Sequence, residues 1–421
     1  MRRLWGALAF IALIVRFSLA QGVSPTPPAD GSDQPIQPID PDGGEPAGSA
    51  SGPATGSAAT GSASMGSGSP ITPATAPSPA AERAVTVDDV VVDASRLRFG
   101  ILLFGDVSAR LQAPAKPSSH FSIGAVGMRL NANLGSNVDA LGEIAFEAGR
   151  VDVEQLVLNY RTPRWVFSLG RLHTELGYWN TAYHHGFWLQ PLIARPHPIR
   201  FEDDGGLVPV HWVGAHLMHR IPVDSGEVIL VGGVGNGRGK IVDDILIDGD
   251  VNQAKGFLLK LAYRRHGEHR IDVGTTAIID RIPPADAMIR PARPDKSIDE
   301  LIVAAHLFYR GPVLTVHAEA FGFFHSADTR HTTTTVFAVA GYRAAESLTA
   351  YGGIDLVVLD ETDPFFVPDP AMPALADVTE LILGARYDLG TWDALKFEGH
   401  ADLHSGAKTQ YTLTANWSFG I

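Results

Sequence analysis

The chain has no cysteine in 421 residues, so it forms no disulfide bonds and carries no lipid on an N-terminal cysteine. Basic residues are also scarce: 33 Lys and Arg stand against 46 Asp and Glu, and the formal net charge is −13. Nucleic-acid binders neutralise phosphate with Lys and Arg, so this balance argues against a nucleic-acid partner.

Common catalytic and cofactor motifs are absent as well. The sequence contains no G-x-S-x-G elbow and no H-E-x-x-H helix. The stretch GGVGNGRGK at 232–240 fails as a phosphate-binding loop, because Val234 and Ile241 stand where Gly and Ser or Thr are required. An acidic stretch at 243–253 lacks the glycine and the distal glutamate of a calcium loop. We therefore expect no enzyme, no catalytic residue, no cofactor and no metal ligand.

The N-terminal part divides into two segments. Residues 1–20 have Arg2 and Arg3 before a short apolar run and end in Ser-Leu-Ala, which predicts a cleaved signal peptide rather than a membrane anchor. Residues 21–90 are almost wholly Pro, Ala, Gly, Ser, Thr and Asp. Such a composition cannot bury enough apolar surface to fold, so it predicts a disordered tether.

Residues 95–421 alternate between apolar and polar side chains, the period of a β-strand. The alternating stretches run for 9–15 residues, whereas strands of soluble proteins usually have about 5–6. A tilted strand needs about 9–11 residues to cross a bilayer. About sixteen strands are predicted, at 96–110, 121–134, 138–148, 152–161, 164–172, 207–220, 226–236, 253–265, 268–281, 298–310, 312–325, 331–343, 346–360, 377–389, 392–404 and 408–421.

The connections between these strands support a closed barrel. An even strand number lets a single chain close with both ends on one side of the membrane, and closure leaves no unpaired strand edge in lipid. Short and long connections should then lie on opposite sides, the short ones in the periplasm. The long connections are all odd-numbered: 111–120, 173–206, 237–252, 282–297 and 361–376.

In its signal peptide, sixteen alternating segments, connection rhythm and C-terminal strand, the chain resembles the Gram-negative outer-membrane porins, in an uncharacterised branch. The resemblance covers residues 95–421. It implies an all-β, closed antiparallel barrel of about 16 strands, forming a water-filled channel for passive diffusion of small polar or charged solutes. It also implies contact with outer-membrane lipid and lipopolysaccharide, a homotrimer, and a tether in the periplasm. Segment 408–421 would be recognised by the barrel-assembly machinery, although Phe419 rather than the last residue, Ile421, is aromatic.

The third external connection, 173–206, is predicted to narrow this channel. In porins of this size the third loop folds into the barrel, and GYWNTAYHHGFWLQ at 177–190 is too apolar for an exposed loop. Basic and acidic groups follow it, and when they face each other across a pore they orient polar solutes. The predicted constriction residues are Tyr178, Trp179, His184, His185, Arg195, Arg200, Glu202, Asp203 and Asp204.

Charged side chains within the strands should face the lumen, because a Lys or Arg facing lipid at the midplane costs about 2–4 kcal/mol. A sixteen-stranded barrel leaves an aqueous channel to receive them. The predicted lumen-lining residues are Lys396, Glu398, His400 and Asp402. Further inward candidates are Glu143 with Glu147, Lys260 with Arg264, Arg270 with Asp272, and His317 with Glu319. Both signs of charge occur, which favours a general polar pore.

Two alternatives stay open from the sequence. One is an outer-membrane barrel that is an enzyme or binds metal through its histidine-rich region 173–211. Adjacent histidines point to opposite faces of a strand, so one ion does not easily bind both His184 and His185. The other alternative is a soluble secreted β-sheet protein that binds a ligand.

Overall fold

The computed structural model describes most of the predicted barrel. The described residues are 98–113, 117–147, 150–183, 188–201, 205–242, 254–285, 288–290, 296–367, 376–403 and 409–421. The predicted signal peptide and tether, 1–20 and 21–90, lie outside these residues.

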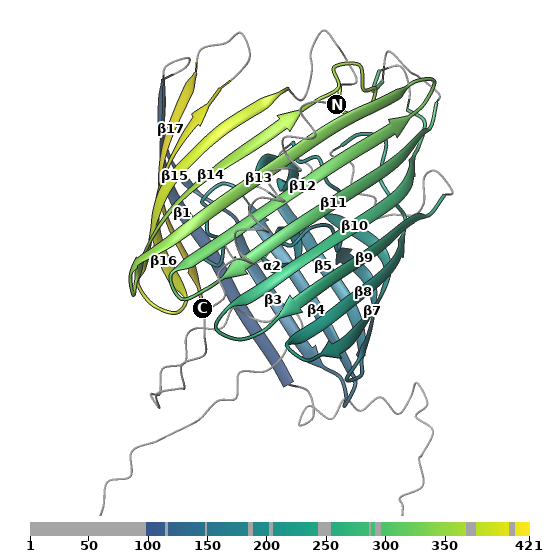
Figure 1. The fold of residues 1–421 in the computed structure, drawn as a ribbon, viewed down its shortest axis with the longest axis horizontal. Helices are drawn as coiled ribbons and strands as arrows, with labels where there is room; N and C mark the ends of the chain where they lie inside the picture. Colours follow the sequence, from purple (N-terminus) through teal and green to yellow (C-terminus); the bar gives the residue numbers. More distant parts are fainter. Residues whose placement is uncertain are drawn as a thin grey trace, which may run out of the picture. The chain divides into compact units, whose positions relative to one another are not determined.

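Seventeen strand segments form one antiparallel sheet, shown in Figure 1. They are β1 (Arg98–Ala113), β2 (Ser118–Ile123), β3 (Val126–Asn133), β4 (Val138–Glu147), β5 (Arg150–Arg161), β6 (Trp165–His173), β7 (His211–Val223), β8 (Gly226–Gly235), β9 (Gly256–Arg265), β10 (Arg270–Ile282), β11 (Ile298–Arg310), β12 (Leu314–Ser326), β13 (Arg330–Ala345), β14 (Leu348–Val358), β15 (Val378–Asp388), β16 (Asp393–Asp402) and β17 (Gln410–Gly420).

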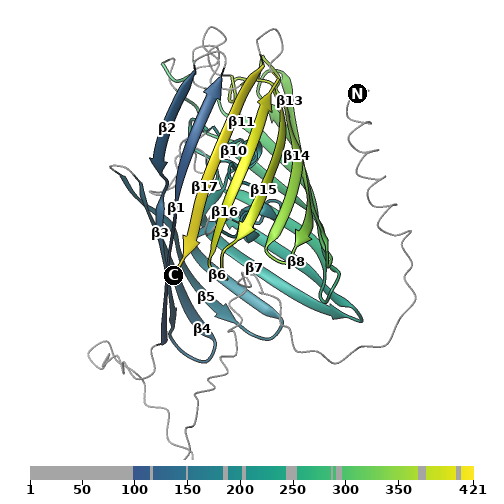
Figure 2. The same cartoon turned by 90° about the vertical axis from the view of Figure 1, so that its left-hand side faces the viewer.

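The sheet closes into a barrel of sixteen strands. β2 and β3 are two parts of one strand, because both pair antiparallel with successive stretches of β1. β1 also pairs with β17, from Phe104 opposite Gly420 to Ala113 opposite Tyr411. Figure 2 shows these two strands side by side, where the first and last parts of the barrel meet. The predicted closed antiparallel barrel is confirmed.

Some predicted boundaries differ from the observed ones. The predicted strand 207–220 is β7, His211–Val223, so its first four residues belong to the preceding connection. The predicted first connection, 111–120, is shorter, since β1 and β2 continue their ladder as far as Gln112 and Ser118. Backbone pairing with a neighbouring strand, rather than side-chain alternation, sets where a strand ends.

The two faces of the wall have opposite character. The outward face carries apolar side chains that remain largely exposed, such as Leu259, Ile279, Leu383, Phe397 and Leu413. The inward face carries many polar side chains that are buried. The exposed apolar side chains therefore lie on the outer face of the barrel wall, and the buried polar side chains lie on its inner face.

The connection between β6 and β7, residues 174–210, contributes to a hydrophobic core with the inward face of the strands. We call it the β6–β7 segment. It contains helix α2 (Trp179–Ala182) and the 3-10 helix η2 (His197–Ile199). Its residues Leu176, Trp179, Leu192, Ile199 and Leu207 are buried in a cluster with residues of β7 to β15. In the described part of the chain, no helix has the length and apolar character needed to cross a membrane.

Candidate channel constriction

The first attachment of the β6–β7 segment to the wall is at Glu319 of β12. The main-chain N–H groups of Tyr178 and Trp179 donate to Glu319 Oε1 over 2.9 and 2.6 Å. Gly177 precedes them with a φ of 76°, and its missing side chain leaves room for the other carboxylate oxygen. His317 Nε2 lies 2.7 Å from Glu319 Oε1. A buried carboxylate thus accepts two N–H groups at the start of α2, a charge-assisted arrangement.

A second attachment is at Glu398 of β16. The N–H groups of Ile193 and Ala194 donate to its two carboxylate oxygens over 3.0 and 3.2 Å. The Tyr351 hydroxyl donates to Glu398 Oε2 over 3.0 Å, and His400 Nε2 lies 2.7 Å from Oε1. The same carboxylate therefore joins the β6–β7 segment to strands β14 and β16.

A third attachment is at Asp355 of β14. The N–H of His197, at the start of η2, donates to Asp355 Oδ2 over 2.5 Å, and the ring atom Nδ1 lies 3.0 Å from the same oxygen. Three carboxylates on three strands thus accept main-chain N–H groups from the segment. Each also contacts a histidine, so the pattern recurs rather than occurring once.

A buried ion pair fixes the start of the segment. Lys260 Nζ of β9 donates to Glu175 Oε2 over 2.8 Å, and the Thr276 hydroxyl donates to the Glu175 carbonyl over 2.9 Å. Burial acts to raise the pKa of the Glu175 carboxyl, but the Lys260 ammonium holds that pKa below its ordinary value. Glu175 is therefore an anion at neutral pH and binds the segment to β9.

The aromatic side chains of the segment pack against the wall. The Tyr178 ring stacks on Phe308 at 4.4 Å, and Trp179 stacks on His317 at 5.5 Å with its edge toward Phe337. Both side chains are buried. Burial raises the pKa of the Tyr178 and Tyr183 hydroxyls above their ordinary value, so both stay neutral. Of the predicted constriction residues, Tyr178 and Trp179 therefore anchor the segment to the wall and do not line open water.

The predicted basic residues lie farther along the segment. The Arg195 guanidinium stacks over the Phe201 ring at 3.8 Å and interacts electrostatically with Glu154 of β5. Arg200 Nη2 lies 3.5 Å from His197 Nδ1. Arg200 also interacts electrostatically with Glu380 of β15, so each arginine has an acid of the wall as its partner. The predicted partners Glu202, Asp203 and Asp204, and the pair His184 and His185, lie outside the described residues.

The predicted lumen-lining residues of β16 are on the inward face but are not a solvated lining. Lys396 has no exposed surface and donates to the Leu192 carbonyl over 3.2 Å. Glu398 is covered by Ile193 and Ala194, and His400 is buried against Glu380 at 2.9 Å. Asp402, near the strand end, is half-buried. Alternation indicates the face on which a side chain lies, but it gives no information about the segment that covers these side chains.

The other inward candidates behave in the same way. Glu143, Lys260, Asp272, His317 and Glu319 are all buried. Arg264 donates to Asp272 over 2.8 Å, and Arg270 lies over the Phe308 ring at 5.8 Å. The side chain of Glu147 lies outside the described ones.

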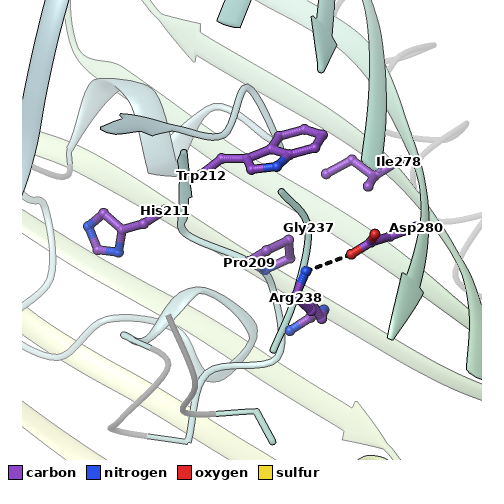
Figure 3. A pocket seen from close by; sticks show the side chains of 7 residues that line it. All are labelled: Pro209, His211, Trp212, Gly237, Arg238, Ile278 and Asp280. Atoms are coloured by element: carbon purple, nitrogen blue, oxygen red, sulfur yellow. Dashed lines mark hydrogen bonds between the residues drawn. The ribbon is translucent and has the colours of Figure 1, made fainter. Parts of the chain in front are cut away.

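Sequence reasoning missed several inward groups that contact the segment or each other: Glu154, Arg238, Asp280, Glu300, Asp355 and Glu380. The N–H of Arg238 donates to Asp280 over 2.7 Å and its Nε donates to Glu300 over 2.9 Å. A small pocket beside them is lined by Pro209, His211, Trp212, Gly237, Arg238, Ile278 and Asp280 (Figure 3). Each of these acids occupies a polar position in an alternating strand. Alternation predicts the face on which the side chain lies, but it does not predict the residue that the side chain contacts.

On strands β4 to β6 the inward polar groups bond along the wall. Asp139 accepts from Asn159 over 2.7 Å and from Arg161 Nε over 2.6 Å, and Ser168 donates to Asn159 over 2.7 Å. The side chains of Asp139 and Arg161 are 31% and 29% exposed. This part of the inward face therefore keeps polar groups in contact with water.

Comparison with known proteins gives matches at the level of structure. No known protein family and no curated protein matches the sequence. An anion-selective porin from Comamonas acidovorans matches over 77% of this chain and 100% of its own, with 11% identity and a TM-score of 0.54. OmpF of Salmonella typhi matches over 78% and 99%, with 11% identity and a TM-score of 0.53. The trimer form of OmpT, an outer-membrane protein of Vibrio cholerae, matches over 77% and 99%, with 12% identity and a TM-score of 0.51.

At such identities the likeness establishes the fold. It agrees with the strand count, the closure of β1 on β17 and the exposed apolar outer face. The chain folds as a closed β-barrel of sixteen strands, similar to the barrels of outer-membrane porins.

Proposed function

We propose that this protein is an outer-membrane channel for the passive diffusion of small polar or charged solutes, narrowed by the β6–β7 segment folded inside the barrel. The observation that carries the proposal is the attachment of this segment to inward-facing carboxylates on β12, β14 and β16. A sixteen-stranded barrel is wide enough to hold water as well as such a segment. Its role is transport without chemistry on the solute.

The route for solutes in this proposal runs along β4 to β6. There Asp139 and Arg161 keep exposed surface, whereas Glu319 on β12 and Glu398 on β16 are covered. Arg195 and Glu154 provide opposite charges between the segment and β5. Fixed charges of both signs across a narrow passage favour polar solutes over apolar ones.

The same proposal includes the surroundings of the barrel. The exposed apolar outer face would contact outer-membrane lipid and lipopolysaccharide, and a homotrimer would match the trimer form known for Vibrio cholerae OmpT. Residues 408–421 would be the segment read by the assembly machinery. The tether at 21–90 would lie in the periplasm.

Conductance in planar bilayers tests the proposal. The refolded protein should give stable single-channel currents with a reversal potential that reports its ion preference in a salt gradient. The double variant Glu319→Gln and Glu398→Gln weakens two attachments and should raise the conductance. Glu268→Gln removes one carboxylate from an exposed turn and should leave the conductance unchanged. Absence of current from folded protein would refute the channel, and unchanged conductance in the double variant would refute the constriction.

A further inference from the structure

We propose that His197, Asp355 and Glu380 bind a divalent transition-metal ion that fastens the β6–β7 segment to strands β14 and β15. His197 belongs to η2, Asp355 to β14 and Glu380 to β15. One ligand atom from each residue lies within 4.8 Å of the other two. The inference deepens the proposed function, since it adds a control on the segment that forms the constriction, but binding itself needs no channel activity.

The separations suit a single ion. His197 Nδ1 lies 3.0 Å from Asp355 Oδ2 and 3.7 Å from Glu380 Oε2. Two atoms bound to one tetrahedral zinc ion at about 2.0–2.1 Å are about 3.3–3.4 Å apart. One observed distance is slightly shorter than that value and the other is slightly longer. An ion between the three groups therefore needs only small side-chain rotations.

A metal ion would also reduce the repulsion between the two carboxylates. Asp355 and Glu380 are directly opposite each other in the ladder of β14 and β15, so their side chains share one face. Like charges in that position destabilise a sheet. Asp355 has no exposed surface, and its Oδ1 atom accepts no hydrogen bond. A buried carboxylate oxygen without a partner is costly, and a metal ion bound through both oxygens of Asp355 would satisfy it.

Neighbouring groups form an outer layer around the site. His400 Nδ1 lies 2.9 Å from Glu380 Oε1, and His400 Nε2 lies 2.7 Å from Glu398 Oε1. Such contacts orient metal-binding carboxylates. Arg200 is the competing cation, with Nη2 3.5 Å from His197 Nδ1. Removing its charge should therefore strengthen metal binding.

The ligand types select the class of ion. One imidazole nitrogen with two carboxylate oxygens suits Zn²⁺ or Mn²⁺, whereas Mg²⁺ and Ca²⁺ prefer all-oxygen sites. Three protein ligands leave at least one position for water.

Direct metal binding tests the site. Full-length protein without a histidine tag, folded in detergent and stripped with a chelator, is dialysed against ZnCl₂, and bound zinc is measured by mass spectrometry. We expect one tightly bound Zn²⁺ per chain that excess Mg²⁺ does not displace. His197→Gln and Glu380→Gln should each lower the affinity at least about 10-fold, and Arg200→Gln should raise it.

A matched control separates this site from other histidine–carboxylate pairs. His306 Nε2 lies 3.0 Å from Asp272 Oδ1, the same separation as in the proposed site, but Arg264 is the third partner there. His306→Gln should leave zinc binding unchanged. Heat-modifiable gel mobility shows which variants are folded, and Asp355→Asn replaces either ligand variant that does not fold. Wild-type protein without a tight zinc, or folded ligand variants with undiminished affinity, would overturn the proposal even where conductance is observed.

Discussion

On strands β4 to β6 the inward polar side chains bond to one another, whereas on β12, β14 and β16 they bond to the β6–β7 segment. Asp139, Asn159 and Ser168 form a chain of contacts along the wall. Glu319 and Glu398 instead accept main-chain N–H groups from residues far away in the sequence. The first arrangement leaves Asp139 and Arg161 partly in contact with water, and the second removes Glu319 and Glu398 from it.

This difference shows how one inward face serves two purposes. A main-chain N–H buried without an acceptor is costly, so a segment inside a barrel must find acceptors on the wall. Carboxylates are strong acceptors, and the histidines beside them, His317 and His400, each lie 2.7 Å from an oxygen that also accepts an N–H of the segment. The covered side therefore acts as a binding surface for the segment, and the four predictions below test the contrast.

Removing the Glu319 carboxylate should have the largest effect. Glu319→Ala leaves the N–H groups of Tyr178 and Trp179 without an acceptor, at about 1–3 kcal/mol each, so we expect a loss of roughly 2–6 kcal/mol. Urea unfolding followed by tryptophan fluorescence in detergent measures it. A loss near zero would mean that the segment is not fastened at this point.

A side chain at Gly177, in the turn before α2, should cause the next largest loss of stability. Gly177→Ala forces a side chain into a left-handed backbone, which costs about 1–2 kcal/mol, and places Cβ 1.9 Å from Glu319 Oε2. Gly267 also has a positive φ, of 108°, but no atom near the position of a new Cβ. Gly267→Ala should therefore cost only the backbone strain, and equal losses in the two variants would contradict the close approach to Glu319.

Acid should weaken the attachment of the β6–β7 segment to β9 by protonating Glu175. Its pKa lies below the ordinary value of 4.5, because Lys260 outweighs the effect of burial. The pair therefore stabilises the fold above that value, and the stabilisation is lost as the pH falls through the lower, folded-state pKa. Between about pH 6 and pH 3, the free energy of unfolding should fall less in Glu175→Gln than in the wild type. The difference should be on the order of 1 kcal/mol. Parallel profiles would exclude this pair as the source.

A substitution on strands β4 to β6 should have the smallest effect on stability. Asp139 and Arg161 are each about a third exposed, so Asp139→Asn should cost only about 0–1 kcal/mol. The lost negative charge should nevertheless shift the reversal potential toward anions, if solutes pass along β4 to β6. A shift of the same size in Glu268→Gln, on an exposed turn, would contradict a solute route beside Asp139.

Much of the fold was predictable because its signals are local. The alternation at 395–404 assigned Lys396 and Phe397 to opposite faces, and the observed burial of one and exposure of the other agree. The aromatic stretch after residue 177 was expected to need cover, and Tyr178 and Trp179 are buried. The interior environment was less predictable, because Lys396 bonds to Leu192, which no local pattern connects to it.

The sequence by itself determined the strands, their two faces and the place of the long connection, because side-chain period and turn composition act over a few residues. Only the tertiary structure decided which inward charges are covered and what they contact. His197 reaches Asp355 across 158 residues, and Tyr178 reaches Glu319 across 141. Such pairs form when the β6–β7 segment packs against the closed wall, and alternation of polar residues is the same whether a segment or water covers them.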